Sequence, residues 1–306
     1  MRQIALALRS ELYKPEELLE FSKLTDDFEN ASHIFFPDLP GGQDAIAVAA
    51  SCLALTKRIM MGSGVIRILE HEGKILARRL ATTQWLSNSR LVLGVGTGSP
   101  GAHPKETIDK LFSALDELRK NFPANFHGQE LTFPEIFVAT LKSGIASRAR
   151  GRAKGLILNF CSPEYAGRLL SEAKIAGGGG GPPKSIVCYV KLFYSERKEL
   201  ANKLLAEEFL KYDGFPQYHA MFEKDGVTQA IGNLRSTIKN NQEIEIPEEL
   251  NKISVANPTK EELVELFEAF RKAGVNIPCA YPYYAPDEST AFKRETLKEL
   301  LSCCSS

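Results

Sequence analysis

Short apolar runs alternate along this chain with longer segments in which apolar residues recur at helical spacing. The short runs are bounded by turn residues and have the length of β-strands, whereas the longer segments predict helices. The predicted strands are Gln3–Leu8, Ser32–Pro37, Arg58–Ser63, Arg90–Gly94, Glu135–Ala139, Gly155–Asn159, Ser185–Phe193 and Asn276–Tyr281. Because a helix separates most neighbouring runs, the strands are expected to pair in parallel.

Helical patterns fill most of the segments between these runs. They are predicted over Lys14–Leu24, Asp44–Thr56, Gly73–Ser87, Lys105–Lys120, Glu164–Ala176, Glu196–Lys211, Pro258–Ala273 and Ser289–Leu301, with a short basic helix between the fifth and sixth strands. Pro258–Ala273 is strongly amphipathic and is followed by Gly274, a residue suited to end a helix. The segment Phe126–Phe133 indicates a small hairpin around His127–Gly128.

Eight strands alternating with helices over 306 residues predict an α/β fold, a (β/α)8 TIM barrel. A doubly wound sheet is the alternative, but no glycine follows the first strand at Leu8-Arg9-Ser10, where a dinucleotide fingerprint would stand. The segment from about 196 to 254 is too long for a plain barrel connection, so we interpret it as a helical insertion after strand seven. Gly177–Gly181 predicts a flexible surface loop, and Ser302–Ser306 a frayed end.

Composition and charge narrow the class of protein. The chain is 43% hydrophobic and 25% charged, which is the balance of one globular domain spanning residues 1–306. Lys+Arg and Asp+Glu both number 38, so nothing indicates a nucleic-acid or membrane partner, and no apolar run is long enough to span a bilayer. The six cysteines and five histidines lack metal-ligand spacing, so no metal site is expected. These features predict a cytoplasmic protein.

Glycines gather at the ends of two predicted strands within the stretch 57–101. Met61–Val65 reads MGSGV, and Gly94–Gly98 reads GVGTG directly behind a second strand. Both sites fall at the carboxyl ends of parallel strands, where α/β folds bind their ligands. Taken alone, GVGTG indicates only a tight turn, because its spacing differs from that of a GxGxxG motif.

The combination of motifs is more informative than either alone. MGSGV, a helix ending in TTQWLSNSR, and LVLGVGTG together resemble the luciferase-like family of flavin and deazaflavin oxidoreductases. They are most similar to the branch that uses coenzyme F420, especially methylenetetrahydromethanopterin reductase. Leu158–Ser162 and Ala256–Gly274 extend the resemblance to about two thirds of the chain. The resemblance implies a barrel, a homodimer, and a cofactor at the carboxyl ends of the strands, either coenzyme F420 or FMN.

Three loops are candidates for holding that cofactor. A flat ring needs a backbone support, which we expect at Gly64 and Val65, where the resemblance implies a bulge with a non-proline cis peptide; Ser63–Gly64 is the alternative place for that bond. The loop after strand four adds Gly96, Thr97 and Gly98. The loop after strand five supplies the phosphate site through Thr140, Leu141, Lys142, Ser143 and Gly144.

Basic residues follow the predicted phosphate loop: Arg148, Arg150, Arg152 and Lys154. They have two interpretations. They either attract an anionic cofactor tail, or they form a solvated basic helix face.

The proton-transfer group is less clear, because the family pattern is incomplete here. The deazaflavin branch commonly carries a carboxylate after its G-x-G-x-G run, where this chain has Ser99, and an Asp-His pair after strand two, where it has Asp38 and Leu39. We take Asp38 and Ser99 as the candidate catalytic positions, with Asp38 as the acid–base group. Second choices are Glu70, His71 and Glu72, and Tyr281–Tyr284 are candidates for the substrate side.

Three functions remain open from the sequence. The first is F420-dependent hydride transfer to or from a small organic substrate. The second is an FMN-dependent monooxygenase of the luciferase type. The third is a relative that binds the cofactor without catalysis, which the missing carboxylates make worth testing.

Overall fold

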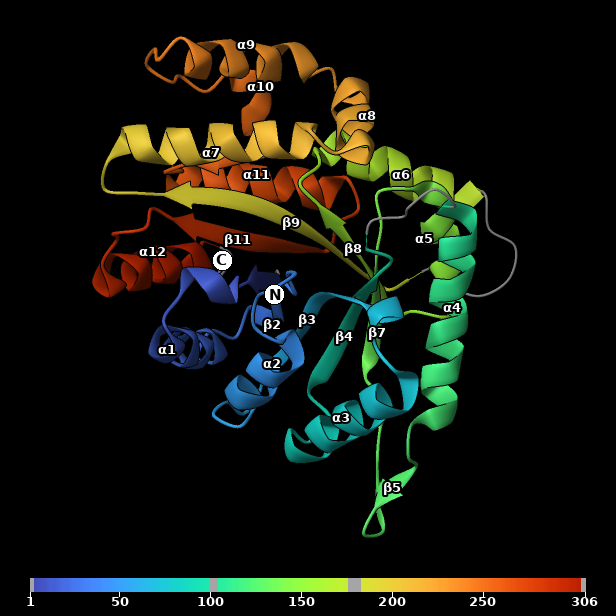
Figure 1. Cartoon of the computed structure of the whole chain (residues 1–306). Helices are drawn as coiled ribbons and strands as arrows, with labels where there is room; N and C mark the ends of the chain where they lie inside the picture. The colour runs from blue at the N-terminus through green and yellow to red at the C-terminus, as the bar shows by residue number, and fades with distance from the viewer. Residues whose placement is uncertain (1–2, 99–103, 176–182, 304–306) are drawn as a thin grey trace.

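Eight parallel strands close into a barrel in the computed structural model, which describes residues 3–98, 104–175 and 183–303 (Figure 1). In order around the barrel they are β1 (Ile4–Ala7), β2 (Ala31–Phe36), β3 (Met60–Arg67), β4 (Leu91–Gly96), β7 (Glu135–Ala139), β8 (Gly155–Asn159), β9 (Ser185–Tyr194) and β11 (Ile277–Tyr284). The ring closes because β9 pairs with β8 as well as β11, and β11 pairs with β1. The predicted (β/α)8 barrel is confirmed.

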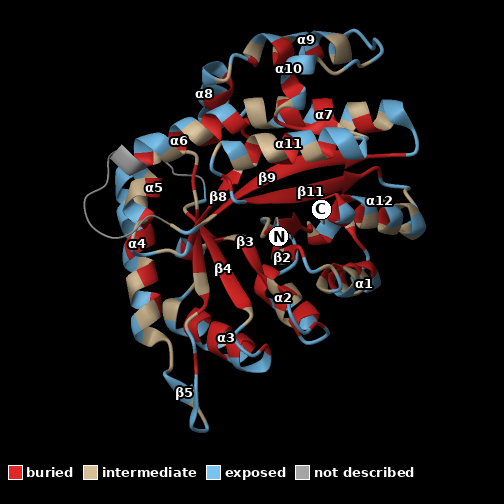
Figure 2. Ribbon diagram, turned by 180° about the vertical axis from the view of Figure 1, so that it is seen from behind, coloured by how far each residue is buried: buried red, intermediate tan, exposed pale blue. Residues whose placement is uncertain are grey.

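Helices cover the outside of the barrel. They are α1 (Pro15–Asp26), α2 (Ala45–Leu53), α3 (Gly73–Leu86), α4 (Pro104–Asn121), α5 (Ser143–Ala149), α6 (Pro163–Ile175), α11 (Lys260–Lys272) and α12 (Thr290–Ser302). Figure 2 shows their inward faces buried against the strands and their outward faces exposed. None of the helices in the described ranges is long and apolar enough to cross a bilayer.

The segment after β9 adds a layer of helices beside the barrel. It contains α7 (Lys198–Asp213), α8 (Pro216–Lys224), α9 (Thr228–Lys239) and α10 (Glu248–Asn251), followed by the short strand β10 (Val255–Ala256), which pairs with β9. Figure 1 shows α7 lying along β9, with α9 stacked outside it. The sequence pattern did not indicate β10. Its backbone extends the sheet beyond the closed ring.

Local signals explain where several helices begin. At α11, the Thr259 hydroxyl accepts a hydrogen bond from the Glu262 amide, and the Glu262 carboxylate accepts one from the Thr259 amide. At α1, Pro15 occupies the first turn while the Glu17 carboxylate accepts the Lys14 amide. The hairpin is also confirmed: β5 (Asn125–Phe126) and β6 (Gln129–Glu130) meet at His127–Gly128, where both residues have positive φ.

Strands β3 and β4 run beyond their predicted ends, and the reason is how their glycines pack. The prediction ended the third strand at Ser63, yet β3 runs on to Arg67. A Cβ on Gly62 would lie 1.7 Å from the carbonyl oxygen of Val92, so this glycine allows two strands to approach closely instead of breaking one. Likewise β4 runs on to Gly96, where the prediction ended at Gly94. β11, which has no glycine, runs on to Tyr284, where the prediction ended at Tyr281.

Two predictions concern residues that lie wholly or partly outside the described ranges. The predicted loop Gly177–Gly181 lies entirely outside them. The end of the chain was predicted to fray from Ser302, but α12 includes Ser302 and Cys303 is buried; the last three residues lie outside the described ranges.

A buried histidine makes stability depend on pH. His33 is 7% exposed, stacks on Phe35 with ring centroids 5.6 Å apart, and has no hydrogen-bond partner at Nε2 among the described residues. Burial, with a smaller contribution from the positive charge of Lys154, lowers its pKa from 6.5 to about 4. The folded protein therefore holds this ring neutral at pH values where the unfolded chain binds a proton.

We expect the stability from this site to be complete above about pH 6.5 and to fall as the pH drops towards 4, by about 3 kcal/mol in total. Urea unfolding across this range should show the loss. His33→Leu should remove this part of the pH dependence, whereas His127→Asn, in an exposed turn, should keep it. An unchanged slope in the His33 variant would contradict this explanation.

Candidate active site

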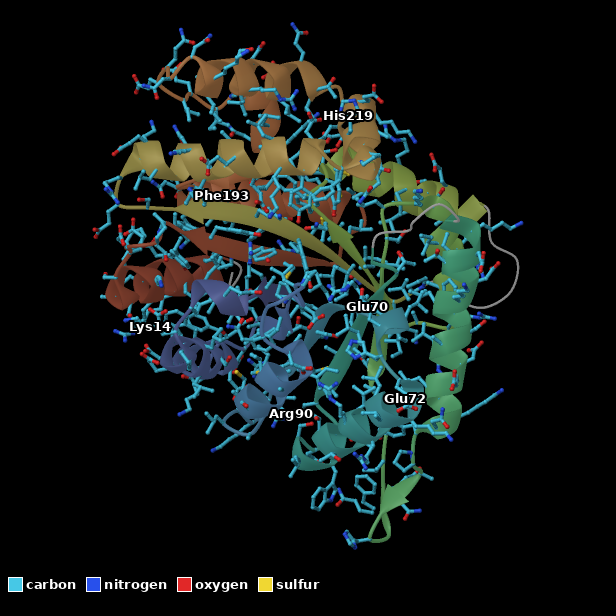
Figure 3. The ribbon with its side chains drawn as sticks, viewed as in Figure 1. Lys14, Glu70, Glu72, Arg90, Phe193 and His219 are labelled. Carbon is cyan, nitrogen blue, oxygen red and sulfur yellow. The ribbon has the colours of Figure 1, made fainter. Side chains whose placement is uncertain are left out.

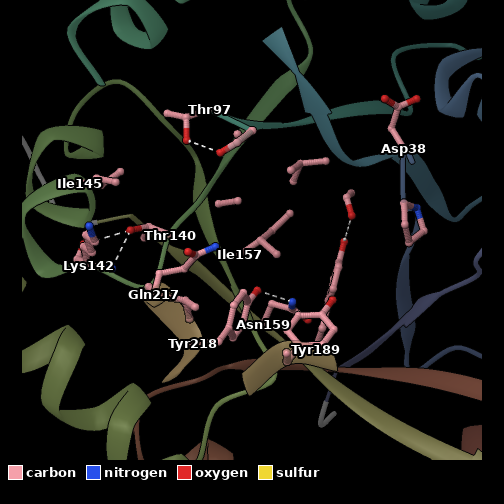
Figure 4. Close-up of a pocket in the computed structure, with 18 of the residues that line it drawn as sticks. Asp38, Thr97, Thr140, Lys142, Ile145, Ile157, Asn159, Tyr189, Gln217 and Tyr218 are labelled. Carbon is pink, nitrogen blue, oxygen red and sulfur yellow. Dashed lines mark hydrogen bonds between the residues drawn. The ribbon is translucent and has the colours of Figure 1, made fainter. Parts of the chain in front are cut away.

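A cavity of about 340 Å³ lies at the carboxyl ends of the strands, a size suited to a small-molecule site (Figure 4). Of the predicted site residues, Asp38, Gly64, Val65, Gly96, Thr97, Gly98, Thr140, Leu141 and Lys142 all line it. Figure 4 shows Asp38 at one side and Lys142 with Thr140 at the opposite side. The roles proposed for these residues remain predictions, but the strand ends bring the residues to one place.

Glycines give this cavity a smooth backbone wall. A Cβ on Gly64 would lie 1.9 Å from the Tyr189 hydroxyl oxygen and 2.7 Å from Cβ of Phe35. That hydroxyl donates a hydrogen bond of 3.2 Å to the Gly64 carbonyl. A Cβ on Gly96 would lie 3.0 Å from Cγ2 of Val65, so these two residues are in contact across the wall. The peptide between Gly64 and Val65 is cis and the β3–β4 register shifts nearby, as the resemblance implied.

Arg67 holds the predicted acid–base residue in place. Its Nη2 lies 3.7 Å from Oδ2 of Asp38, its Nη1 donates to the Asp38 carbonyl at 3.2 Å, and its Nε pairs with Glu70 at 2.7 Å. Gly98, with φ of +70°, packs over the Arg67 side chain, where a Cβ would lie 2.9 Å from Cδ. The Asp38 carboxylate is therefore paired with the Arg67 guanidinium at the cavity rim.

The loop after β7 is shaped by the Thr140 side chain. Its hydroxyl oxygen accepts a hydrogen bond from the Lys142 amide at 2.9 Å and lies 3.0 Å from the Lys142 carbonyl, to which it donates. Lys142 is exposed and stands just before α5, which has only seven residues, so the charge of the loop comes from the Lys142 ammonium more than from a helix terminus. Ser143 and Gly144 do not line this cavity.

A second cavity of about 690 Å³ adjoins the first and shares Leu141, Lys142 and Gln217 with it. Ser143 lies here, and three cations line the space: Lys142, Arg168 and Lys224. Glu172 is its one lining carboxylate among the described residues. A hydrogen bond of 2.8 Å from the Tyr165 hydroxyl to the Leu141 carbonyl connects the floor of this cavity to the β7 loop.

The other basic residues of the region have different partners. Arg148 forms an ion pair of 2.6 Å with Asp109 of α4, Arg152 lies 3.8 Å from Asp116 of the same helix, and Lys154 pairs with Glu135 at 2.7 Å. Neither cavity is lined by these side chains or by Arg150. The ion pairs and the distance from both cavities favour the interpretation of these residues as a solvated basic face.

The remaining catalytic candidates lie elsewhere. Glu70 pairs with Arg67, and the Glu72 carboxylate accepts the amides of Lys74 and Ile75 at the start of α3, so both serve the loop after β3 (Figure 3). His71 does not line the cavity either. Ser99 lies outside the described residues.

Comparisons with known proteins agree with this geometry. The model of the family described as luciferase-like monooxygenase matches residues 26–276. The chain belongs to the luciferase-like monooxygenase family. Its members are oxidoreductases, so this luciferase-like protein is an enzyme of that class. No curated protein matches the sequence.

Solved structures similar to this luciferase-like protein include users of both cofactors. The coenzyme F420-dependent tetrahydromethanopterin reductase from Methanopyrus kandleri has a TM-score of 0.68 and 15% identity, covering 99% of each chain. An F420-dependent secondary alcohol dehydrogenase in complex with an F420–acetone adduct has 0.68 and 16%, covering 98% of this chain and 99% of that one. The oxygenating constituent of 3,6-diketocamphane monooxygenase from Pseudomonas putida, in complex with FMN, has 0.68 and 14%, covering 100% and 98%. At these identities the TM-scores show the shared fold alone.

The insertion of this luciferase-like chain supplies cavity residues that the sequence interpretation missed. Tyr212, Gln217 and Tyr218 come from α7 and α8, and the Tyr218 hydroxyl accepts a hydrogen bond of 2.6 Å from Asn159 of β8. Tyr281 of β11 completes this side, as the sequence analysis expected. The sequence contains one signal that the insertion packs against the barrel. Lys191 interrupts the apolar run SIVCYVKLF, and a lysine in a buried strand needs a partner from a neighbouring element.

Proposed function

We propose that this protein is a coenzyme F420-dependent oxidoreductase that transfers a hydride between the deazaflavin and a small organic substrate. The observation that carries the proposal is the basic second cavity beside the first. FMN ends at a phosphate, whereas F420 continues beyond its phosphate into a tail that carries glutamate carboxylates. Two adjoining cavities, the second lined by three cations and one carboxylate, suit the longer and more anionic cofactor.

The residues present fit such a cofactor. The wall at Gly64, Val65 and Gly96 offers a flat backbone surface. A Cβ added at either glycine would lie 3.0 Å or less from a neighbouring atom. Lys142 stands where the two cavities join, the position for a phosphate. When bound, the deazaflavin would supply or accept a hydride at its ring. The chain's part is to hold the ring against the glycine wall and leave the side with Tyr212 and Tyr281 to the substrate.

Oxygen use separates this proposal from its alternative, an FMN-dependent monooxygenase. Lys142 suits the FMN phosphate equally well, so the choice depends on the second cavity. With the enzyme present, reduced F420 should react with small carbonyl compounds, and oxidised F420 with small alcohols, in both cases without oxygen uptake. Oxygen consumption with reduced FMN, and no reaction of F420 under anaerobic conditions, would favour the monooxygenase.

Replacing the two cavity lysines should distinguish phosphate from tail. Lys142→Ala should weaken binding of both F420 and FMN by about 1.5–3 kcal/mol, the range for a charge-assisted hydrogen bond. Lys224→Ala should weaken F420 alone, by about 0.5–1 kcal/mol, because its ammonium is exposed. Fluorescence titration measures both constants, with Lys260→Ala on the exposed face of α11 as the control. Equal dissociation constants for all three variants would remove these residues from the site.

We also propose that the protein is a cytoplasmic homodimer. Ile75, Trp85 and Leu86 of α3 are 52%, 40% and 65% exposed, an apolar content that supports a protein partner for this helix. Light scattering at micromolar concentration tests the dimer, and a monomer mass would contradict it.

A further inference from the structure

A buried lysine stands directly behind one wall of the active-site cavity. Lys191 of β9 is 0% exposed, and its ammonium forms an ion pair with Glu208 of α7. The Tyr283 hydroxyl donates to the same carboxylate at 3.2 Å. Burying an ion pair costs free energy that its own attraction seldom exceeds by much, so a pair placed beside a cavity suggests a functional role.

Tyr212 links this ion pair to the cavity. It lies in the last turn of α7 and lines the cavity, while Nζ of Lys191 is 3.8 Å from the centre of its ring. The same ammonium is farther from the rings of Phe160, at 4.8 Å, and Tyr281, at 5.6 Å. A cation this close favours negative charge on the phenol oxygen of Tyr212.

Tyr212 differs from every other tyrosine of the chain. Burial acts to raise its pKa, but the positive charge of Lys191, with hydrogen bonds from Lys191 and Asn159, outweighs burial and lowers it below 10. Burial raises the pKa of each of the other eight: Tyr13, Tyr165, Tyr189, Tyr194, Tyr218, Tyr281, Tyr283 and Tyr284. Tyr212 is thus the phenol of this protein that ionises most readily.

The charges around Tyr212 come from each element packed against it. Two ammonium groups and one carboxylate face it, with neutral phenols on the neighbouring strand and helix: Lys191 on β9, Glu208 and Lys211 on α7, Tyr218 on α8, and Tyr281 and Tyr283 on β11. The Lys211 ammonium is 5.8 Å from the ring centre. The surplus of positive charge favours the phenolate.

Other groups on the cavity are less suited to transfer a proton. The Tyr189 hydroxyl donates to the Gly64 carbonyl, burial raises the pKa of Tyr218 well above its usual range, and Asp38 is held by Arg67. Tyr212 is partly exposed and lines the cavity.

We propose that Tyr212 is the general acid–base of this site and acts on the oxygen of a carbonyl or alcohol substrate, with Lys191 as its positioning charge. The inference rests on the proposed hydride transfer. As hydride forms the new C–H bond, the π electron pair of the carbonyl moves to oxygen, and that oxygen takes the proton as the O–H bond of Tyr212 breaks. Lys191 stabilises the phenolate, and water returns the proton.

Spectrophotometric titration of the protein without cofactor tests the ionisation directly. Tyrosinate absorbance should rise in an early step that belongs to a single phenol, before the other eight ionise. The step should vanish in Tyr212→Phe and move to higher pH in a Lys191→Met/Glu208→Leu double variant. It should persist in Tyr194→Phe, which removes a buried hydroxyl with no hydrogen-bond partner among the described residues. An early step that survives in Tyr212→Phe would overturn the assignment.

Kinetics with F420 test the catalytic role. With acetone, cyclohexanone and butanal as probes, Tyr212→Phe should lower kcat by roughly 10²–10⁴-fold, the range for general acid–base catalysis, and leave the F420 dissociation constant unchanged. In the wild type, kcat for carbonyl reduction should fall as pH rises through the early step. A kcat within about twofold of wild type would overturn the inference while the proposed function stands. Absence of F420 binding would overturn the proposed function and leave the titration result intact.

Discussion

Glu208→Ala is expected to lower the free energy of unfolding by about 3–5 kcal/mol, because it leaves the Lys191 ammonium buried without its carboxylate. Lys191 is 0% exposed and Glu208 8%, so water cannot replace the lost partner without opening the core. The Tyr283 hydroxyl loses its acceptor as well. Urea unfolding monitored by circular dichroism measures the change at neutral pH.

The matched control removes both charges together. Lys191→Met/Glu208→Leu should be clearly more stable than Glu208→Ala, since an apolar pair of similar volume leaves no buried charge. Lys203→Met/Glu207→Leu, an exposed pair on the same helix, should change stability by less than about 1 kcal/mol. A Glu208→Ala variant as stable as wild type would show that Lys191 is not held as a buried cation.

Gly64→Ala is expected to weaken F420 binding about 10–100-fold, or about 1.4–2.8 kcal/mol, and to lower stability by about 1–3 kcal/mol. The added methyl group would lie 1.9 Å from the Tyr189 hydroxyl and 2.7 Å from Cβ of Phe35, so the tyrosine must move and the wall loses its shape. Gly232→Ala in α9, with nothing within 4 Å of its Cβ, should instead stabilise by about 0.5–1 kcal/mol. Unchanged F420 binding in the Gly64 variant would show that the ring does not rest on this wall.

The barrel was predictable because its strands are nearly continuous apolar runs separated by strongly periodic helices. The strand ends were harder to place, because a glycine that ends a strand and a glycine that lets two strands approach closely look alike in a sequence. Gly64 was taken to follow a strand that ended at Ser63, but it lies within β3 as Gly62 does, where neighbouring strands and Tyr189 leave no space for a side chain. Packing between strands determines whether such a glycine lies within a strand, and this packing is not a local property of the sequence.

The candidate site was predictable where it is built from strand ends. Asp38, Gly98 and Lys142 follow parallel strands and Gly64 lies in the last half of one, and such positions meet at one edge of a barrel. The residues contributed by the insertion were not predictable in this way. Tyr212 and Tyr218 reach the cavity because α7 packs on β9 and α8 packs on α7, long-range contacts without a periodic signal. Lys191 was visible as a lysine in an apolar strand, but its partner Glu208 was not.

Cofactor preference is tested most directly by equilibrium titration of the purified protein with F420 and, separately, with FMN, followed by cofactor fluorescence. F420 should saturate a single site per chain, with a dissociation constant lower than that of FMN by about tenfold or more, since only F420 can fill both cavities. Equal or tighter binding of FMN, or no saturable binding of F420, would contradict the assignment of this enzyme to deazaflavin chemistry.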